Sequence, residues 1–267
     1  DGAPGWQRAL RRLLALGHAP SQADVWQVAA PVLDAWGGNP GLATATLASL
    51  ARGRHAGVAR ELVRCMRARL IEADAFHLTA AIAACGKAGA WQLACTGLGG
   101  MTDDQVAPNA ISLNAAISAC EKGGCWQNAL CLLGAMSGLQ AVPNIISFSA
   151  SISACGKSGR WQLAFAMLGI MTDVQVAPNV FSCSAVVSAC EKGGRWQAAF
   201  AVLDVMAEMR VAPNVVCCSA LISACEKAGG WQQAIAMLAA MKGLRVTPNL
   251  ISYNSAISAC EKGGCWQ

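Results

Sequence analysis

The feature that most constrains the fold of this chain is a dipeptide that returns at a fixed interval. Trp-Gln pairs recur every 35 residues, at Trp91, Trp126, Trp161, Trp196, Trp231 and Trp266. Pro-Asn pairs keep the same interval and end at Asn109, Asn144, Asn179, Asn214 and Asn249. A constant period of this length is typical of stacked supersecondary repeats that bury their apolar faces against one another. We therefore expect an elongated repeat array.

Each repeat contains two apolar stripes with helical spacing. In the repeat 110–144, the first stripe is formed by Leu113, Ala116, Ile117 and Cys120. The second is formed by Trp126, Ala129, Leu130, Leu133 and Met136. Both follow the 3.6-residue period, so the repeat is predicted to be a hairpin of two helices in an all-α protein. Ser112 is the expected N-cap, Gly123-Gly124 the expected end of the first helix, and Pro143 a block to further helix.

The repeats divide the chain into a regular array and a degenerate beginning. The array is predicted over 40–267, with repeats 40–74, 75–109, 110–144, 145–179, 180–214 and 215–249 and a partial repeat 250–267. Residues 1–39 are interpreted as degenerate helical remnants. Trp6-Gln7 and Trp26-Gln27 are only 20 residues apart, which predicts that a first helix is missing between them, and Pro31 is expected to kink the second segment. Residues 5–16 are also Arg-rich and acid-free, as in a transit segment, but the repeat interpretation is favoured.

Composition excludes several other classes of protein. The 14 cysteines contain no C-x-x-C pair, and six of them share one buried position of the repeat, which favours small core residues and a reducing compartment. These six are Cys85, Cys120, Cys155, Cys190, Cys225 and Cys260. Residues 123–156 carry no charge, but Pro143 interrupts them before a membrane span could form. We expect no membrane segment and no cofactor.

A lysine also returns once per repeat, at the edge of the face opposite the core. The six residues are Lys87, Lys122, Lys157, Lys192, Lys227 and Lys262. Stacking predicts a column of positive charge that would contact the phosphates of a polyanion. The alternative is an ordinary solvated face, since Glu121, Glu191, Glu226 and Glu261 precede four of the lysines.

The repeat length, the paired helices, the closing Pro-Asn and segments such as Ile251-Ser-Tyr-Asn-Ser-Ala-Ile257 resemble the P-type repeats of pentatricopeptide repeat proteins. The Trp-Gln and Ala-Cys-Glu-Lys-Gly-Gly segments resemble members from dinoflagellate algae. The resemblance implies a right-handed α-solenoid that binds single-stranded RNA. It also implies a role in RNA processing or stabilisation in an organelle, either chloroplast or mitochondrion.

In that family the fifth and last residues of each repeat read one base, and the second residue packs against the base. The implied base-reading pairs are Thr44 with Asp74, Thr79 with Asn109, Asn114 with Asn144, Ser149 with Asn179, Ser184 with Asn214 and Ser219 with Asn249, followed by Asn254. The implied base-packing residues are Phe76, Ile111, Ile146, Phe181, Val216 and Ile251, whereas Gly41 offers no side chain. Read parallel to the protein, these residues imply the site 5′-GAYAAAY.

The sequence contains no pattern that indicates catalysis or metal binding. No H-x-E precedes a C-x-x-C, and the histidines His18, His55 and His77 are scattered. We therefore expect no enzyme activity, and His77 is expected to serve as a helix cap or a surface residue. Single-stranded RNA is the expected partner of a monomer that could also recruit processing factors. The alternatives are a helical scaffold for protein–protein interaction and a decayed array without a ligand.

Overall fold

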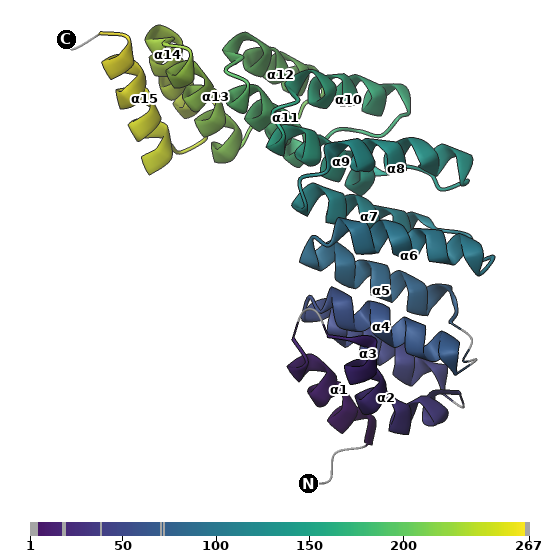
Figure 1. Ribbon diagram of the computed structural model, residues 1–267. Coiled ribbons are helices and arrows are strands. Elements are labelled where there is room, and N and C mark those ends of the chain that lie inside the picture. Colours follow the sequence, from purple (N-terminus) through teal and green to yellow (C-terminus); the bar gives the residue numbers. More distant parts are fainter. Residues whose placement is uncertain (1–4, 18–19, 38, 70, 72, 265–267) are drawn as a thin grey trace. The chain divides into compact units, whose positions relative to one another are not determined.

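The computed structural model describes residues 5–17, 20–37, 39–69, 71 and 73–264. All regular secondary structure among these residues is helical (Figure 1). The helices are α1 (Gly5–Ala15), α2 (Gln22–Gly37), α3 (Pro40–Arg52), α4 (Ala56–Ala68), α5 (Ala75–Ala88), α6 (Trp91–Asp103), α7 (Ala110–Lys122), α8 (Trp126–Gly138), α9 (Ile145–Lys157), α10 (Trp161–Asp173), α11 (Val180–Lys192), α12 (Trp196–Glu208), α13 (Val215–Lys227), α14 (Trp231–Gly243) and α15 (Leu250–Lys262).

The chain forms two compact units, Asp1–Pro143 and Asn144–Gln267, and each is a stack of helix hairpins. In the first unit α3, α5 and α7 pack side by side as one layer, and α4, α6 and α8 pack on that layer. In the second unit α9, α11, α13 and α15 form the layer on which α10, α12 and α14 pack. The predicted all-α repeat solenoid is confirmed, and its handedness stays a prediction. No helix in the described part of the chain is both long and apolar enough to cross a bilayer.

The closing Asn of one repeat is the N-cap of the next first helix. Asn109 Oδ1 accepts a hydrogen bond from Ser112 N at 2.9 Å, and Ser112 Oγ accepts one from Asn109 N at 3.0 Å. This reciprocal pair is a capping box, so the prediction of Ser112 as N-cap is wrong. The shift has a physical reason. Asn109 has an extended backbone, at φ −105° and ψ 173°, which is the conformation that an N-cap needs.

The cysteine column lies in the core as predicted for five of its six members. The side chains of Cys85, Cys120, Cys155, Cys190 and Cys225 are buried, whereas Cys260 in the last helix is half-buried. Burial raises the pKa of Cys85 to about 11 and that of Cys120 to about 12. Every cysteine described by the structure is a free thiol. These thiols therefore act as small apolar side chains between helices.

The tryptophans that begin the second helices lie at the junctions between repeats and not in the core. Trp161 is half-buried, and its ring covers the first glycine of the next repeat's turn. A Cβ on Gly193 would lie 2.8 Å from Trp161 Cδ1, so this contact requires a glycine. The guanidinium carbon of Arg195 lies 5.8 Å from the centroid of the same ring, in cation–π range. The expected Trp stripe in the core is thus wrong, because the ring is shared with solvent.

Replacing Trp161 by alanine should lower the free energy of unfolding by about 2 kcal/mol. Truncating a fully buried aromatic ring costs roughly 3–5 kcal/mol, but a half-buried ring buries less apolar surface, so its truncation costs less. Urea unfolding followed by circular dichroism measures the difference. Leu163→Ala, in the same helix and 38% exposed, is the control and should cost under about 0.5 kcal/mol. An unchanged urea midpoint for the Trp161 variant would show that the junction adds nothing to stability.

The turn after each first helix needs a left-handed residue. The second residue of this turn is a glycine with a positive φ in the regular repeats, for example 74° at Gly124 and 67° at Gly159. Arg54 stands at the equivalent position of the repeat 40–74 and has a φ of 62°. A side chain with a Cβ is strained in this region, whereas glycine is not.

Arg54→Gly should therefore stabilise the protein by about 1 kcal/mol, through relief of that strain. The melting temperature measures the effect. The matched control is Arg52→Gly, which removes the same charge from the last residue of α3, where φ is not positive, and should destabilise by up to about 1 kcal/mol. If both variants lose stability equally, the left-handed strain at Arg54 is not real.

The first two helices pack as a hairpin. α1 packs mainly against α2 and only lightly against α3, and α2 packs mainly against α4. The described residues between α1 and α2 form no further helix, and α1 itself takes the place of the first helix that was expected to be missing. The Trp-Gln of α1 marked a second helix, but tertiary packing puts α1 where a first helix belongs. α2 continues through Pro31 as one helix.

The basic helix α4 is not simply a solvated face. Glu61 is only 3% exposed and is paired with Arg60 and Arg64 on the same helix. Arg67 bonds to Gly100 O at 3.2 Å and forms an ion pair with Asp104. The arginines of α4 thus compensate a buried carboxylate and join this hairpin to the next.

Candidate functional site

Three positions of each repeat meet at the start of the first helix. The second residue lies two positions after the N-cap of the first helix and points outward, and the fifth lies one turn later. The closing residue ends the repeat and is the N-cap of the first helix of the next repeat. The second residues are the predicted base-packing set, Phe76, Ile111, Ile146, Phe181, Val216 and Ile251, and they are 59% to 74% exposed. A recurrent row of exposed apolar side chains is unusual for a solvated face and marks a contact surface.

The closing residues are held rigidly by the helices that they cap. Asn179 Oδ1 accepts hydrogen bonds from Phe181 N at 3.0 Å and Ser182 N at 2.9 Å. Asp74 Oδ1 does the same for Phe76 N at 3.0 Å and His77 N at 2.9 Å. The closing side chain is therefore adjacent to the exposed second residue of the following helix.

His77 replaces the usual serine in its capping box. Its Nδ1 lies 3.3 Å from Asp74 N and 2.7 Å from Asp74 Oδ1, and its Nε2 lies 3.1 Å from Pro40 O. The predicted cap role of His77 is confirmed, but the ring is 1% exposed and not on the surface. His77 thus links the N-terminus of α5 to that of α3.

The structure brings two of the predicted reading pairs into contact. Ser184 Oγ donates to Asn214 Oδ1 at 3.4 Å, although the two residues are 30 positions apart. Ser219 Oγ donates to Asn249 Oδ1 at 3.3 Å across the same separation. The two serines are only 8% and 6% exposed, which is deeper than the sequence indicated. They lie beneath the closing amides and hold them in place.

The other fifth residues show different contacts. Thr44 Oγ1 donates to Pro40 O within its own helix at 3.3 Å. The hydroxyl oxygens of Thr79 and Ser149 are buried and have no protein hydrogen-bond partner. Asn114 belongs to the first compact unit and is half-buried, whereas Asn254 in α15 is exposed.

The predicted phosphate-contacting lysines are exposed at the ends of the first helices, and some bond to the preceding repeat. Lys122 Nζ donates to Gly86 O at 2.8 Å. Lys227 and Lys262 form ion pairs of 2.9 Å with Glu191 and Glu226. The column is therefore partly neutralised, and these ion pairs would have to open before the ammonium groups reached a phosphate.

The carboxylate of Glu226 shows the effect of these contacts. Burial alone would raise its pKa, but hydrogen bonds from Lys262 and Ser258 lower the pKa below its ordinary value. The ion pair is thus retained at neutral pH and is lost as the pH falls through the lowered pKa.

One basic residue of this column was missed from the sequence. Arg52 is the last residue of α3 and stands 35 residues before Lys87. Lys87 and Lys122 occupy the corresponding places near the ends of α5 and α7. Its Nη2 donates to Ser49 Oγ at 2.9 Å. The 35-residue spacing marks this position, although it carries an arginine where the later repeats carry a lysine.

Among the residues that the structure describes, no three His, Cys, Asp or Glu side chains are grouped so as to hold a metal ion. The polar groups that converge are amides, hydroxyls and one carboxylate, which suits recognition by hydrogen bonding.

Comparisons with known proteins agree with this geometry. Family models match as "Pentatricopeptide repeat domain" over residues 168–227 and 201–262 and as "PPR repeat" over 146–175. No curated protein matches. The chain is an all-α repeat solenoid, and its residues 146–262 belong to the pentatricopeptide repeat family.

Solved structures share the fold at low sequence identity. The pentatricopeptide repeat protein PPR10 in complex with an 18-nt psaJ RNA element is 23% identical with a TM-score of 0.73, over 98% of this chain and 37% of that one. PPR10 from maize is 20% identical with a TM-score of 0.62, over 94% and 44%. The PPR domain of Arabidopsis thaliana protein-only RNase P 1, in complex with tRNA, is 16% identical with a TM-score of 0.58, over 67% and 95%. The chain thus spans less than half the length of either PPR10 chain.

Proposed function

We propose that this protein binds single-stranded RNA and reads one base per repeat through the closing residues. The similar solved structures of PPR10 with an RNA element and of the RNase P 1 domain with tRNA support an RNA ligand. The exposed apolar row supports it further, because flat bases can pack on such side chains.

The observation that carries the proposal is that the amide oxygens of the closing residues already accept hydrogen bonds from the protein. Asn214 Oδ1 accepts from Cys217 N at 2.8 Å and from Ser184 Oγ at 3.4 Å. Asn249 Oδ1 accepts from Ser252 N at 2.9 Å and from Ser252 Oγ at 2.9 Å, while Ser219 Oγ lies 3.3 Å from it and 2.8 Å from Ser252 Oγ. A carbonyl oxygen has two lone pairs, so the acceptor capacity of both amides is used inside the protein. What each amide can still offer a ligand is the Nδ2 donor.

This asymmetry gives each closing residue a base preference. A fixed Nδ2 donor suits a base whose ring nitrogen accepts, which is adenine or cytosine. In Asp74 the Oδ1 atom is used by the cap, so Oδ2 remains as an acceptor. An acceptor suits a base with a ring N–H, which is guanine or uracil. The site 5′-GAYAAAY follows when the fifth residues choose between purine and pyrimidine, and we extend the proposal to RNA stabilisation or processing in an organelle.

Binding to the heptamer 5′-GACAAAC and to its scrambled form 5′-CAAGACA tests the proposal. The two RNAs have the same composition, so charge and stacking are matched and only order differs. Fluorescence anisotropy should show the first bound at least about tenfold more tightly, since each mismatched base costs about 1–3 kcal/mol in a specific complex. Equal affinity would remove base reading, and no binding to either would remove RNA as the ligand.

A protein-binding scaffold is the second candidate, because the exposed apolar row could also hold an apolar peptide. A peptide groove, however, has no need for an amide at each N-cap whose oxygen is already occupied. If the RNAs fail to bind, the substitution Phe181→Ser with a peptide-library readout becomes the relevant experiment, and loss of peptide capture would support the scaffold.

A further inference from the structure

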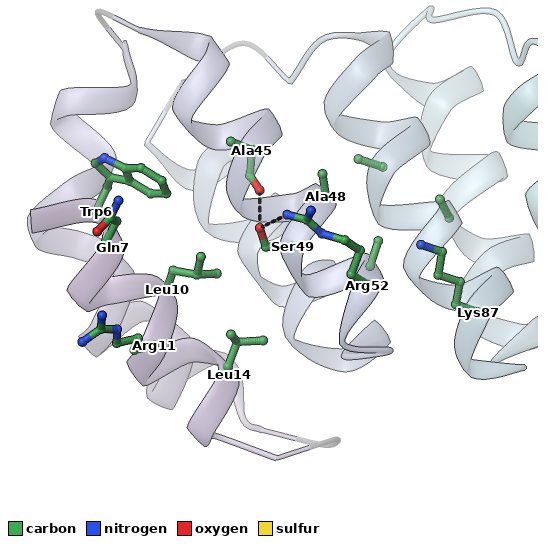
Figure 2. A pocket seen from close by; sticks show the side chains of 13 residues that line it. Trp6, Gln7, Leu10, Arg11, Leu14, Ala45, Ala48, Ser49, Arg52 and Lys87 are labelled. Atoms are coloured by element: carbon green, nitrogen blue, oxygen red, sulfur yellow. Dashed lines mark hydrogen bonds between the residues drawn. The ribbon is translucent and has the colours of Figure 1, made fainter. Parts of the chain in front are cut away.

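A groove of about 690 Å³ lies between α1 and the first helices α3 and α5. It forms because α1 packs on α2 and hardly touches α3. Figure 2 shows Trp6, Leu10 and Leu14 extending from α1 toward α3, with Arg52 and Lys87 on the opposite side. Its floor is made of small side chains, including Ala45, Ala48, Ala80 and Ala83. The volume is in the range of pockets that enclose one small ligand.

The charge of the groove indicates an anionic occupant. Arg52 is fixed over it by the 2.9 Å bond from Nη2 to Ser49 Oγ, which is itself bonded to Ala45 O at 2.9 Å (Figure 2). Lys87 extends toward Arg52 from α5, and Arg11 lines the groove through its stem with its guanidinium turned outward. None of the described residues that line the groove is acidic. Two directed cations without a carboxylate favour a phosphate.

The groove is also continuous with the proposed RNA surface. Arg52 and Lys87 are the first two members of the basic column that continues to Lys122 on α7. The first two residues of the basic column therefore line the groove, and α1 forms the opposite wall. Trp6, which is half-buried, adds an aromatic ring on the α1 wall that a base can stack on.

We propose that this groove binds the 5′-terminal nucleotide of the RNA, with its phosphate between Arg52 and Lys87 and its base against Trp6. The inference rests on the proposed function, which places the 5′ end of the RNA at α1. A terminal phosphate carries one more negative charge than an internal one, so the groove distinguishes an RNA end from a passing strand.

The test compares RNAs that begin at the first read base or one nucleotide before it, each with a 5′-phosphate, a 5′-hydroxyl or a 3′-phosphate. In one of the two registers the 5′-phosphate should tighten binding by about tenfold, the size expected for a hydrogen bond to a charged group. Arg52→Gln should abolish this gain and, because Arg52 also belongs to the basic column, weaken 5′-GACAAAC and its scrambled form by the same factor. Arg12→Gln on α1 removes the same charge outside the groove and should keep the gain.

Each outcome separates the inference from the function on which it rests. Sequence-specific binding that ignores the 5′-phosphate in both registers, or that gains as much from a 3′-phosphate, would overturn the terminal site and leave base reading intact. Loss of sequence preference for all RNAs would overturn base reading first. Trp6→Leu provides a second variant, which should weaken binding of the 5′-phosphate and 5′-hydroxyl RNAs alike in the register that shows the gain, and an unchanged affinity would remove the base from the groove.

Discussion

Replacing Asn179, Asn214 and Asn249 together by aspartate should change the preferred RNA at three consecutive bases from AAA to GGG. Each change turns a fixed amide donor into a carboxylate acceptor, which repels the accepting nitrogen of adenine and accepts from the ring N–H of guanine. At about 1–3 kcal/mol per mismatched base, the affinity for 5′-GACAAAC should fall by roughly 100-fold or more. The affinity for 5′-GACGGGC should rise correspondingly. Anisotropy titrations with the two RNAs measure the exchange.

The triple variant should keep its fold, because aspartate is as good an N-cap as asparagine. Asp74 already caps α5 with two hydrogen bonds in this protein. A melting temperature within a few degrees of the parent confirms that the comparison is between two folded proteins. Asn→Ser at the same three positions is the control, since serine also caps but has a shorter side chain. This control should weaken binding to both RNAs, and a triple aspartate variant that still prefers adenine would refute the reading mechanism.

Replacing Gly86 by alanine should cost about 2–3 kcal/mol of stability, in the range of other overpacked cores. A Cβ on this residue of α5 would lie 2.6 Å from Ala115 O and 3.3 Å from Ala115 C on α7. These are backbone atoms, so the helices themselves would have to move apart. The same movement would break the 2.8 Å bond from Lys122 Nζ to Gly86 O. Guanidinium unfolding measures the loss.

The matched control is Gly134→Ala, also in a helix of the first compact unit. A Cβ there meets no atom within 4 Å, so only the helix propensity changes and the protein should gain about 1 kcal/mol. The same Gly→Ala substitution should thus lower the free energy of unfolding at Gly86 and raise it at Gly134. Equal shifts of the unfolding midpoint would show that α5 and α7 are not packed as closely as described.

The sequence predicted the fold well, because a 35-residue period leaves few ways to bury both apolar stripes. It placed the Gly-Gly turn and the buried cysteines from spacing alone. It missed the position of α1, because Trp-Gln marks a second helix locally and only tertiary packing decides which neighbour a terminal helix adopts. It also missed the N-cap, because Ser112 and Asn109 are both good capping residues and only the extended backbone before the helix selects between them.

The candidate site was predictable in its positions but not in its hydrogen bonds. The resemblance to pentatricopeptide repeats placed Ser184 and Asn214 together, and they lie in contact. The burial of Ser184 could not be foreseen, because it depends on how closely the next first helix approaches. The same packing decides that the amide oxygen is used inside the protein and that the donor is left for a base.

The most direct test of this account is a double substitution across one proposed contact, from Asn214 Nδ2 to the ring nitrogen N1 of the fifth base in 5′-GACAAAC. Replacing that adenine by 1-deazaadenine removes only the accepting nitrogen, and Asn214→Ser removes the amide donor while keeping a capping oxygen. We predict that each change alone weakens binding by about tenfold and that the two together weaken it no further. Losses that multiply to about a hundredfold would show that the two groups do not touch, and would contradict the account.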